Sequence, residues 1–355
     1  MISISLCMIV KDEEKNIERC LSSVEGIVDE IIIVDTGSKD KTKVKVKEHG
    51  ARIYDFKWEN DFSEARNFSF SKATKDYILW LDADDVLKYE HREELLKLKD
   101  NLGLYIDSVV MNHVLACNEE GEPISYLKRN RLMKRICRFK WKGRVYEDID
   151  VRGNTLNSDI CIIHKRKKEH VDRKFEICEI MRNEKVDFSA RELYFYANEL
   201  YDYKMYDEAI EEYIKFFNKE EFLLEDTNSA CLRIADCYRN KGEEEKEFEF
   251  LFKSFQYNIP SSEVCCRIGS KFLDKKQYNK AIFWYNTAIK NKPEPDYLGL
   301  INSAYHTWVP YLQLCICYCY VGEFEFANKC NEIALRYNKN HPSILKNRTY
   351  LKERI

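Results

Sequence analysis

Three acidic side chains follow a run of apolar residues in the segment YILWLDADDVL, residues 77–87. Residues 78–81 are all apolar, which is typical of a buried strand in a parallel sheet. Asp82 and Asp84 then stand two positions apart on the chain that leaves this strand. Two carboxylates so placed can reach one hard cation, and Mg²⁺ or Mn²⁺ held by carboxylates commonly bridges to phosphate oxygens. A surface turn is the alternative, because Asp is common in turns and at helix N-caps.

The acids lie in a part of the chain, from Met1 to about His164, in which strands and helices are expected to alternate. The expected strands are ISISLCMIV, EIIIVD, ARIYDF and YILWLD, and the expected helices are DEEKNIERCLSSV, DKTKVKVKEHG and FSEARNFSFSKA. This alternation predicts an α/β fold with a mainly parallel sheet that is covered on both faces. In such sheets ligands bind beyond the carboxyl ends of the strands, which is where Asp82 and Asp84 are placed.

The second half of the chain is predicted to be all helical and repetitive. Four segments align: KMYDEA (204–209), GEEEKE (242–247), KQYNKA (276–281) and GEFEFA (322–327). Twelve residues before the last member of each lies a small or compact residue, namely Ala197, Ala235, Gly269 and Cys315. Small residues let two antiparallel helices approach closely, and stacked pairs bury a continuous core, so this half resembles the tetratricopeptide repeats. Glu247 departs from the expected Ala, so we expect the second copy to be degenerate.

The composition of the whole chain excludes several classes of protein. A length of 355 residues favours two domains. The 58 basic and 61 acidic side chains give a net charge of −3, without the basic excess that nucleic-acid binding usually needs. The longest apolar run, residues 311–321, is far shorter than the roughly 20 residues of a membrane-spanning helix, and no basic leader precedes the first strand. We therefore expect a soluble cytoplasmic protein whose 14 cysteines are reduced core thiols and form no structural metal site.

Four motifs, in this order over the first 85 residues, resemble the family 2 glycosyltransferases of the GT-A fold. They are SLCMIVKDEEKNIERCLSSV, DEIIIVDTGSKDKT, NDFSEARNFSFSKA and YILWLDADD. In that family the second strand ends in D-x-G-S-x-D and the fourth carries D-x-D. The resemblance covers about Ile2 to His164. Asp12 stands where the family more often has Asn, a change that keeps the size and the acceptor capacity of the side chain.

The resemblance implies roles for residues that would bind a nucleotide sugar. Val10 and Glu13 would line the nucleotide pocket, and Asp35 would accept a hydrogen bond from the uracil or ribose edge. Arg66 would neutralise the diphosphate, and Asp82 would contact the ribose as well as the metal ion.

The resemblance also implies a metal site made by Asp82, Asp84 and His164. His164 comes directly after another apolar run, and a lone His there is more often structural, so both interpretations of it stay open. An imidazole with two carboxylates would suit Mn²⁺ as well as Mg²⁺. The basic run 165–168 could steer a nucleotide diphosphate, but a solvated run is favoured.

The segment FKWKGRVYEDI, residues 139–149, resembles the W-x-G-x-V-H-E segment of one branch of the family. That branch includes lipopolysaccharide-core transferases and sublancin-type peptide S-glycosyltransferases, and it carries helical repeats after its catalytic domain. Tyr146 replaces the usual His. An inverting transferase needs a base on the acceptor side. Glu147 is the predicted base, and Asp148 is the alternative. The other interpretation is that the segment YED is an ordinary polar loop without a catalytic role.

These observations lead to an expected organisation and function. A GT-A domain is expected over residues 1–168, a helical linker over 169–190 and tetratricopeptide-like repeats over 191–355. The expected reaction is the inverting, metal-dependent transfer of a sugar from a nucleotide sugar, a UDP-hexose. The expected acceptor is a peptide, protein or glycan that the repeats hold. A homodimer through the repeats is a further expectation. The alternatives are a repeat-based scaffold with a degenerate transferase domain and a nucleotidyltransferase, for which a Gly-rich loop should follow the first strand.

Overall fold

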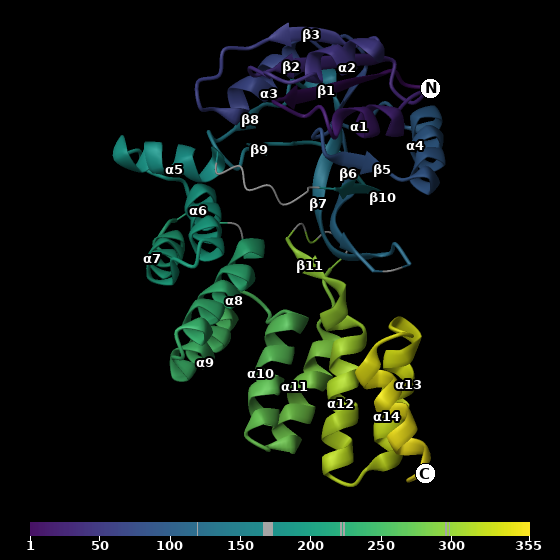
Figure 1. The fold of residues 1–355 in the computed structure, drawn as a ribbon, viewed down its shortest axis with the longest axis vertical. Coiled ribbons are helices and arrows are strands. Elements are labelled where there is room, and N and C mark those ends of the chain that lie inside the picture. The colour runs from purple at the N-terminus through teal and green to yellow at the C-terminus, as the bar shows by residue number, and fades with distance from the viewer. Residues whose placement is uncertain (119, 166–172, 221, 223, 295–296, 298) are drawn as a thin grey trace. The chain divides into compact units, whose positions relative to one another are not determined.

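A computed structural model describes residues 1–355 except 119, 166–172, 221, 223, 295–296 and 298. The chain divides into two compact units, Met1–Phe188 and Ser189–Ile355 (Figure 1). The expected end of the first domain at residue 168, and the start of the expected linker, lie outside the described residues. The described part of that linker contains helix α5 (Arg173–Asn183). Among the helices that the structure describes, none combines the length and the apolar character needed to span a membrane.

The first unit begins with the expected alternation of strands and helices. Its elements are β1 (Ile4–Val10), α1 (Ile17–Ser23), β2 (Glu30–Asp35), α2 (Thr42–Glu48), β3 (Arg52–Asp55), α3 (Phe62–Ser71) and β4 (Tyr77–Trp80). Strand β1 pairs in parallel with β2 and with β4, and β2 pairs in parallel with β3. The carboxyl ends of these strands therefore meet at one edge of the sheet, as the α/β prediction requires.

Helix α1 begins at Ile17 rather than at the start of the amphipathic stretch. The backbone N–H groups of Asp12, Glu13 and Glu14 donate instead to side chains of the loop after β2 and of the first residue of α2. Those acceptors are Ser38 Oγ at 2.9 Å, Thr42 Oγ1 at 2.7 Å and Asp40 Oδ2 at 3.0 Å. Asp12 also has a positive φ of 54°, which a helix does not allow. Contacts with a distant loop thus override the local helical pattern at this point.

The remaining elements of the first unit complete a mixed sheet. They are β5 (Asp85–Leu87), α4 (Tyr89–Asn101), β6 (Ser108–Cys117), β7 (Pro123–Lys134), the short 3₁₀ helix η1 (Arg135–Cys137), β8 (Trp141–Lys142), β9 (Asp148–Ile149) and β10 (Thr155–His164). The strand order is β3-β2-β1-β4-β7-β6-β10-β5, and β8 and β9 form a separate two-stranded sheet. Strand β7 runs antiparallel between β4 and β6, β10 is parallel to β6, and β5 is antiparallel to β10.

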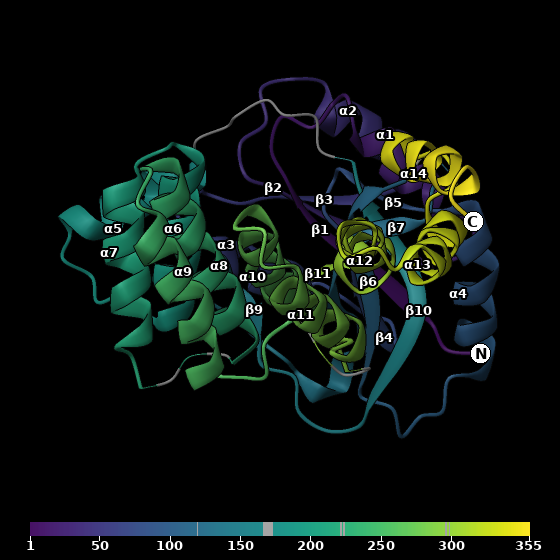
Figure 2. The same cartoon turned by 90° about the horizontal axis from the view of Figure 1, so that it is seen from below.

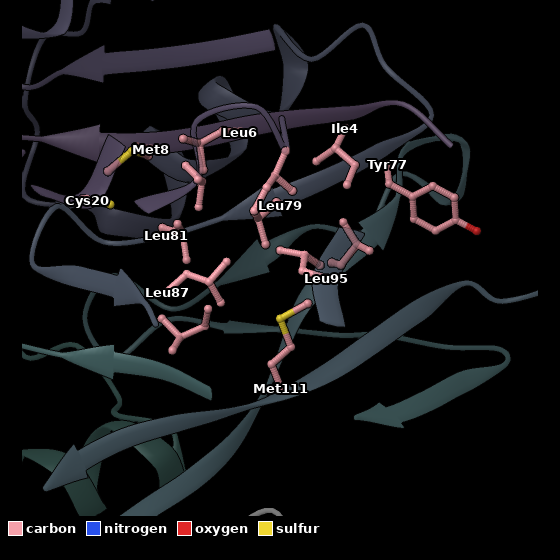
Figure 3. Packing of buried hydrophobic residues seen from close by; sticks show 14 of the residues in the cluster. Ile4, Leu6, Met8, Cys20, Tyr77, Leu79, Leu81, Leu87, Leu95 and Met111 are labelled. Atoms are coloured by element: carbon pink, nitrogen blue, oxygen red, sulfur yellow. The ribbon is translucent and has the colours of Figure 1, made fainter. Parts of the chain in front are cut away.

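Buried side chains on both faces of β1 and β4 hold the sheet in place. Leu6, Met8 and Leu79 belong to one apolar cluster, which also contains residues of α1 and α4 (Figure 3). Cys7 and Ile78 belong to a second cluster, with side chains of α3 packed against it. Because both faces are covered, these strands are apolar at successive positions, as the sequence predicted. The end of β4, and with it the acidic segment, is therefore fixed by a packed core.

The second unit consists mainly of consecutive helices that lie side by side (Figures 1 and 2). They are α6 (Ala190–Asp202), α7 (Tyr206–Phe217), α8 (Leu224–Asn240), α9 (Glu244–Lys253), α10 (Ser262–Asp274), α11 (Tyr278–Lys290), α12 (Trp308–Tyr320), α13 (Phe324–Tyr337) and α14 (Pro342–Lys352). Two 3₁₀ helices, η2 (Ser254–Gln256) and η3 (Ser303–His306), and the short strand β11 (Ile301–Asn302) complete it. The prediction of an all-helical repeat region is confirmed.

The small residues of the repeats lie where their helices meet. Ala197, Ala235 and Cys315 are fully buried. A Cβ atom on Gly269 would come within 2.9 Å of the ring of Tyr285, which lies on the next helix, α11. The absence of a larger side chain at these positions therefore allows close packing of neighbouring helices, as in tetratricopeptide repeats.

Glu247 occupies the position where the other copies have a fully buried Ala. Its carboxylate is itself buried, and it pairs with Arg239 at 2.7 Å and with Lys271 at 2.5 Å. Arg267 Nη2 lies 3.8 Å from the same carboxylate. These cations come from helices α8 and α10, so the second copy keeps its packing through an ionic cluster instead of a small side chain.

Candidate active site

The acidic segment after β4 forms a tight turn. The backbone N–H of Asp85 donates to the carbonyl of Asp82 at 3.0 Å, and the N–H of Asp82 donates to Asp85 Oδ2 at 3.0 Å. The side chain of Asp85 is fully buried, whereas those of Asp82 and Asp84 are 33% and 16% exposed. The turn therefore directs one carboxylate inward and leaves two partly open to solvent.

The buried carboxylate of Asp85 is paired with Arg131, a fully buried residue of β7. Arg131 Nη1 lies 2.9 Å from Asp85 Oδ2, and Arg131 Nη2 lies 2.6 Å from His113 Nδ1. The guanidinium also lies 3.9 Å from the ring centroid of Trp80. Although burial opposes it, the charge of Arg131 lowers the pKa of Asp85. Burial, together with the charge of Arg131, lowers the pKa of His113 to about 3, so His113 is neutral and accepts from Arg131.

His164, at the end of β10, lies across the strand pair from Asp85. Its Nδ1 atom is 3.2 Å from Asp85 Oδ1 and 3.4 Å from Asp84 Oδ1. Burial acts to lower the pKa of His164, but the hydrogen bond to Asp85 and the charge of Asp84 raise it overall. Burial and the charges of Asp82 and Asp85 raise the pKa of Asp84, although the charge of His164 opposes them. A proton on Nδ1 would leave Nε2 of His164 as a lone-pair nitrogen.

Among the described residues, Asp85, His113 and His164 bring one ligand atom each within 4.8 Å of one another. A metal ion is nevertheless disfavoured between these three. The guanidinium of Arg131 contacts both Asp85 and His113, and an Arg side chain keeps its positive charge in proteins. A cation would therefore be repelled there, and the partly exposed side of the cluster, at Asp84 and His164, is the better place for one.

Arg66 of α3 joins Asp82 to Glu147. Its Nη2 lies 2.8 Å from Asp82 Oδ1, and its Nε lies 2.6 Å from Glu147 Oε1. The guanidinium packs against both Trp80 and Trp141, with its carbon 5.0 and 4.9 Å from the two ring centroids. Burial opposes ionisation, but the charges of Asp82 and Glu147 raise the pKa of Arg66 overall. The charge that was expected to neutralise a diphosphate is thus balanced by two carboxylates in this structure.

The small sheet formed by β8 and β9 positions Glu147. Trp141 of β8 pairs with Ile149 of β9, and the side chain of Asn67 bonds both to the N–H and to the carbonyl of Trp141, at 2.9 Å each. This contact fixes the hairpin on α3, the helix that also carries Arg66. Glu147 is 10% exposed and reaches Arg66, whereas Asp148 lies on β9 with an exposed side chain.

The residues expected to bind the nucleotide lie at the same edge of the sheet, after β1 and β2. Asp35 Oδ1 accepts from the N–H groups of Gly37 and Ser38 at 3.0 and 2.9 Å. Its Oδ2 atom is buried and has no hydrogen-bond partner among the described residues. Burial, and then the charges of Asp84, Asp82 and Asp40, raise the pKa of Glu13. Val10, the last residue of β1, is buried and belongs to the core cluster of the sheet.

Two residues of this cluster were not identified from the sequence, namely Arg131 and His113. Arg131 lies in the segment KRNRLMK, whose charged residues predict an exposed edge rather than a buried pair. His113 follows Asn112 in β6, a strand that is otherwise mainly apolar, and this pattern is more typical of a core histidine than of a site residue. Asp85 was noted as an acid, but its inward direction follows from the turn after Asp82. A fully buried Arg needs a partner, but the sequence does not indicate which acid this is.

Residues 5–152 match the family model described as Glycosyl transferase family 2. The chain is 42% identical over 131 residues to a TPR repeat-containing protein of Synechococcus elongatus, covering 37% of this chain and 32% of that protein. It is 33% identical over 149 residues to the SPbeta prophage-derived glycosyltransferase SunS of Bacillus subtilis, covering 41% of this chain and 34% of that protein. The chain thus spans about a third of the length of these relatives.

A solved structure is also similar to part of the chain. The crystal structure of MamA aligns with a TM-score of 0.35 and 18% identity, covering 44% of this chain and 82% of that one. The assignment of the helices to tetratricopeptide-like pairs rests on the buried small residues of the repeats rather than on this alignment.

Proposed function

We propose that this chain, whose residues 5–152 match the family 2 glycosyltransferase model, transfers a sugar from a nucleotide sugar to an acceptor, with inversion and with a divalent metal ion. The observation that carries the proposal is one connected cluster at the carboxyl end of β4. In it Arg66 joins Asp82 to Glu147, and His164 lies beside Asp84. The proposed donor is a UDP-hexose, the proposed acceptor is a peptide, protein or glycan, and the proposed location is the cytoplasm.

The residues of the cluster fit Mn²⁺ or Mg²⁺. Asp82 and Asp84 offer partly exposed carboxylates, and His164 offers Nε2 when Asp85 accepts the proton on Nδ1. A buried carboxylate behind a histidine is the usual support of a metal-binding imidazole, because it fixes the orientation of the ring. When bound, such an ion would stabilise the negative charge of the departing diphosphate.

The nucleotide would be held by the loops that follow β1 and β2. Asp35 Oδ2 is the acceptor proposed for an N–H of the base or an O–H of the ribose, because it is buried without a partner in the described part of the chain. Two backbone N–H groups hold the other oxygen of this carboxylate, so its direction is fixed before a ligand arrives. Glu13 lies close enough to the acids after β4 for their charges to act on it.

Glu147 is the proposed general base. An inverting transfer needs a group that takes the proton of the acceptor nucleophile on the side opposite the leaving diphosphate. Arg66 holds Glu147 Oε1, so Oε2 is the atom that would receive the proton. The pairing of Arg66 with Asp82 couples the position of this base to the acids at the end of β4.

A panel of nucleotide sugars tests the proposal. The full chain is incubated with UDP-, GDP- and dTDP-linked hexoses, and hydrolysis is measured with Mn²⁺, with Mg²⁺ and with excess EDTA. We expect slow hydrolysis of a UDP-hexose that needs the metal ion and is lost in Asp84→Ala. The matched control is Asp100→Ala, which removes an exposed acid of α4 outside the cluster. If no nucleotide sugar is hydrolysed or protects the chain against thermal unfolding, the scaffold alternative is favoured instead.

A further inference from the structure

Three large apolar side chains protrude from one surface of the first unit. Ile136 in η1 is 75% exposed, and Leu104 and Tyr105, in the loop after α4, are 70% and 72% exposed. The side chain of Lys134, directly before η1, donates to the carbonyl of Leu104, so the two segments lie against each other. Apolar side chains of this size are rarely so exposed in a group unless the surface binds something.

An open hollow of about 470 Å³ adjoins η1 and is lined mainly by cations. Its charged residues are Arg138, Lys140, Lys142, Arg152 and Asp150. Lys142 and Arg152 both pair with Asp150, at 3.3 and 2.9 Å. Arg138 and Lys140 are exposed and have no acidic partner among the described residues. The hollow therefore carries an excess of positive charge that its single acid does not balance.

The apolar residues of this surface lie at the end of β4 opposite the acid cluster, whereas the hollow extends to Lys142 of the β8–β9 hairpin, which pairs with Asp148. Tyr77, the first residue of β4, pairs with Lys134 at the end of β7, whereas Asp82 lies two residues after Trp80, the last residue of β4. Residues that reach the acid cluster, such as Arg66 and Glu147, are not among those that line the hollow. Arg138 and Lys140, the two cations of the hollow without an acidic partner in the described part of the chain, are not among the residues proposed for catalysis.

We propose that Ile136, Leu104, Tyr105 and the four cations of the hollow form a docking surface for an anionic membrane. Lys and Arg side chains are attracted to anionic headgroups, and apolar side chains among them can enter the boundary between headgroups and acyl chains. A soluble anion such as phosphate would engage the cations but would leave the three apolar side chains in water. The combination of protruding apolar residues and unbalanced cations favours the lipid surface. Such docking does not need a membrane-spanning helix.

Vesicle flotation with the full chain tests this inference. We expect binding to vesicles that contain phosphatidylserine, no binding to vesicles of phosphatidylcholine alone, and release as the salt concentration rises. The assay needs neither a donor nor turnover, so its outcome does not depend on the proposed transferase activity. Equal binding to both kinds of vesicle, or to neither, would overturn the proposal.

Two variants separate a membrane from other anionic partners. Each Lys or Arg near an anionic surface strengthens binding about fivefold, so Arg138→Glu with Lys140→Glu should weaken it about 25-fold or more. The control, Lys47→Glu with Lys97→Glu, makes the same change in net charge at two exposed lysines of α2 and α4 and should leave binding unchanged. If the control variant loses as much vesicle binding as the test variant, the proposed docking surface is wrong.

Ile136→Ser keeps the charge and removes the most exposed of the three apolar side chains. We expect it to weaken vesicle binding severalfold, because that side chain would otherwise enter the boundary region. Since Ile136 makes little contact within the unit, the variant should fold normally, which thermal unfolding of the full chain verifies. Unchanged vesicle binding by Ile136→Ser, with loss in the double Glu variant, would overturn the membrane proposal in favour of a purely ionic partner such as an acidic protein or free phosphate.

Discussion

Neighbouring acids after β4 have different cationic partners, and this difference separates their roles. Asp85 is fully buried against Arg131, and Asp82 is held by Arg66. Among the described residues, the cationic partner of Asp84 is the imidazole of His164. Of the three carboxylates, Asp84 is therefore the one with most capacity left for a metal ion, whereas Asp85 supports the structure around it.

We therefore expect Asp84→Ala to affect activity and Asp85→Ala to affect stability. Asp84→Ala should abolish metal-dependent hydrolysis of the donor while leaving the free energy of unfolding nearly unchanged, because the side chain is partly exposed and fills no core volume. Asp85→Ala should lower the free energy of unfolding by about 3–5 kcal/mol, because it leaves the buried charge of Arg131 without its partner. Denaturant unfolding and hydrolysis assays on both variants check this. Full activity of Asp84→Ala, or of the parent chain in excess EDTA, would rule out the metal-dependent reaction.

Glu147 and Asp148 can be separated by the same kind of comparison. Glu147→Gln keeps an oxygen for Arg66 but cannot take a proton, so it should lower the turnover rate about 10²–10⁴-fold and weaken donor binding much less. A thiol acceptor would reduce this effect, since cysteine with a pKa of roughly 8.5 already supplies some thiolate near neutrality. Single-turnover kinetics and donor titration measure the two quantities. If Asp148→Asn shows the loss of rate instead, the base lies one residue further along the chain.

At the scale of the elements, the β8–β9 hairpin connects the two halves of the site. Asn67 and Arg66 are consecutive residues of α3, and they hold Trp141 and Glu147 of this hairpin region. Helix α3 thus carries the group that contacts Asp82 as well as the groups that fix the proposed base. A small movement of this helix would displace both at once.

The ionic cluster in the second repeat gives a prediction for the helices. Glu247→Ala restores the residue of the other copies, but it should destabilise the chain by about 2–3 kcal/mol, because Lys271 and Arg267 would lose a buried anion. The control is Glu244→Ala on the same helix, whose exposed carboxylate lies 3.8 Å from Lys271 and should matter little. Thermal unfolding of the two variants is the measurement. An unchanged or higher melting temperature for Glu247→Ala would show that a small residue suffices there.

At the scale of the whole molecule, the two compact units suggest a division of labour. The proposed site lies entirely within Met1–Phe188, whereas Ser189–Ile355 carries stacked helices of the kind that form extended binding surfaces. We propose that the helical unit holds the acceptor. The alternative is that the helical unit has no binding role and only covers apolar surface of the transferase domain.

Separating the units tests this division. A fragment of residues 1–188 should still hydrolyse the donor slowly but should lose transfer to the natural acceptor, because the first unit keeps the acid cluster and Glu147. Hydrolysis and transfer are compared with those of the full chain at equal concentration. Transfer at the full rate by a soluble fragment would exclude the acceptor role, and an insoluble fragment would support the covering role.

The sequence by itself determined those features that depend on neighbours along the chain. The strand–helix alternation, the placement of Asp82 and Asp84 after a buried strand, and the register of small residues from Ala197 to Cys315 all arise from local periodicity, and the structure contains each of them. Periodic patterns are informative because buried positions recur at a fixed spacing, once per turn of a helix and at every second residue of a strand. The domain boundaries and the roles of the site residues stay predictions.

Only the tertiary structure decided which distant charges meet. Strand β7 is inserted antiparallel between β4 and β6, and this arrangement brings Arg131 to Asp85 and His113. In the same way, the packing of the β8–β9 hairpin on α3 brings Glu147 to Arg66. A charged residue in a sequence can be paired with any of many opposite charges. The order of strands in the sheet and the free-energy cost of leaving a buried charge unpaired together select the actual partner. The local sequence pattern reveals neither of them.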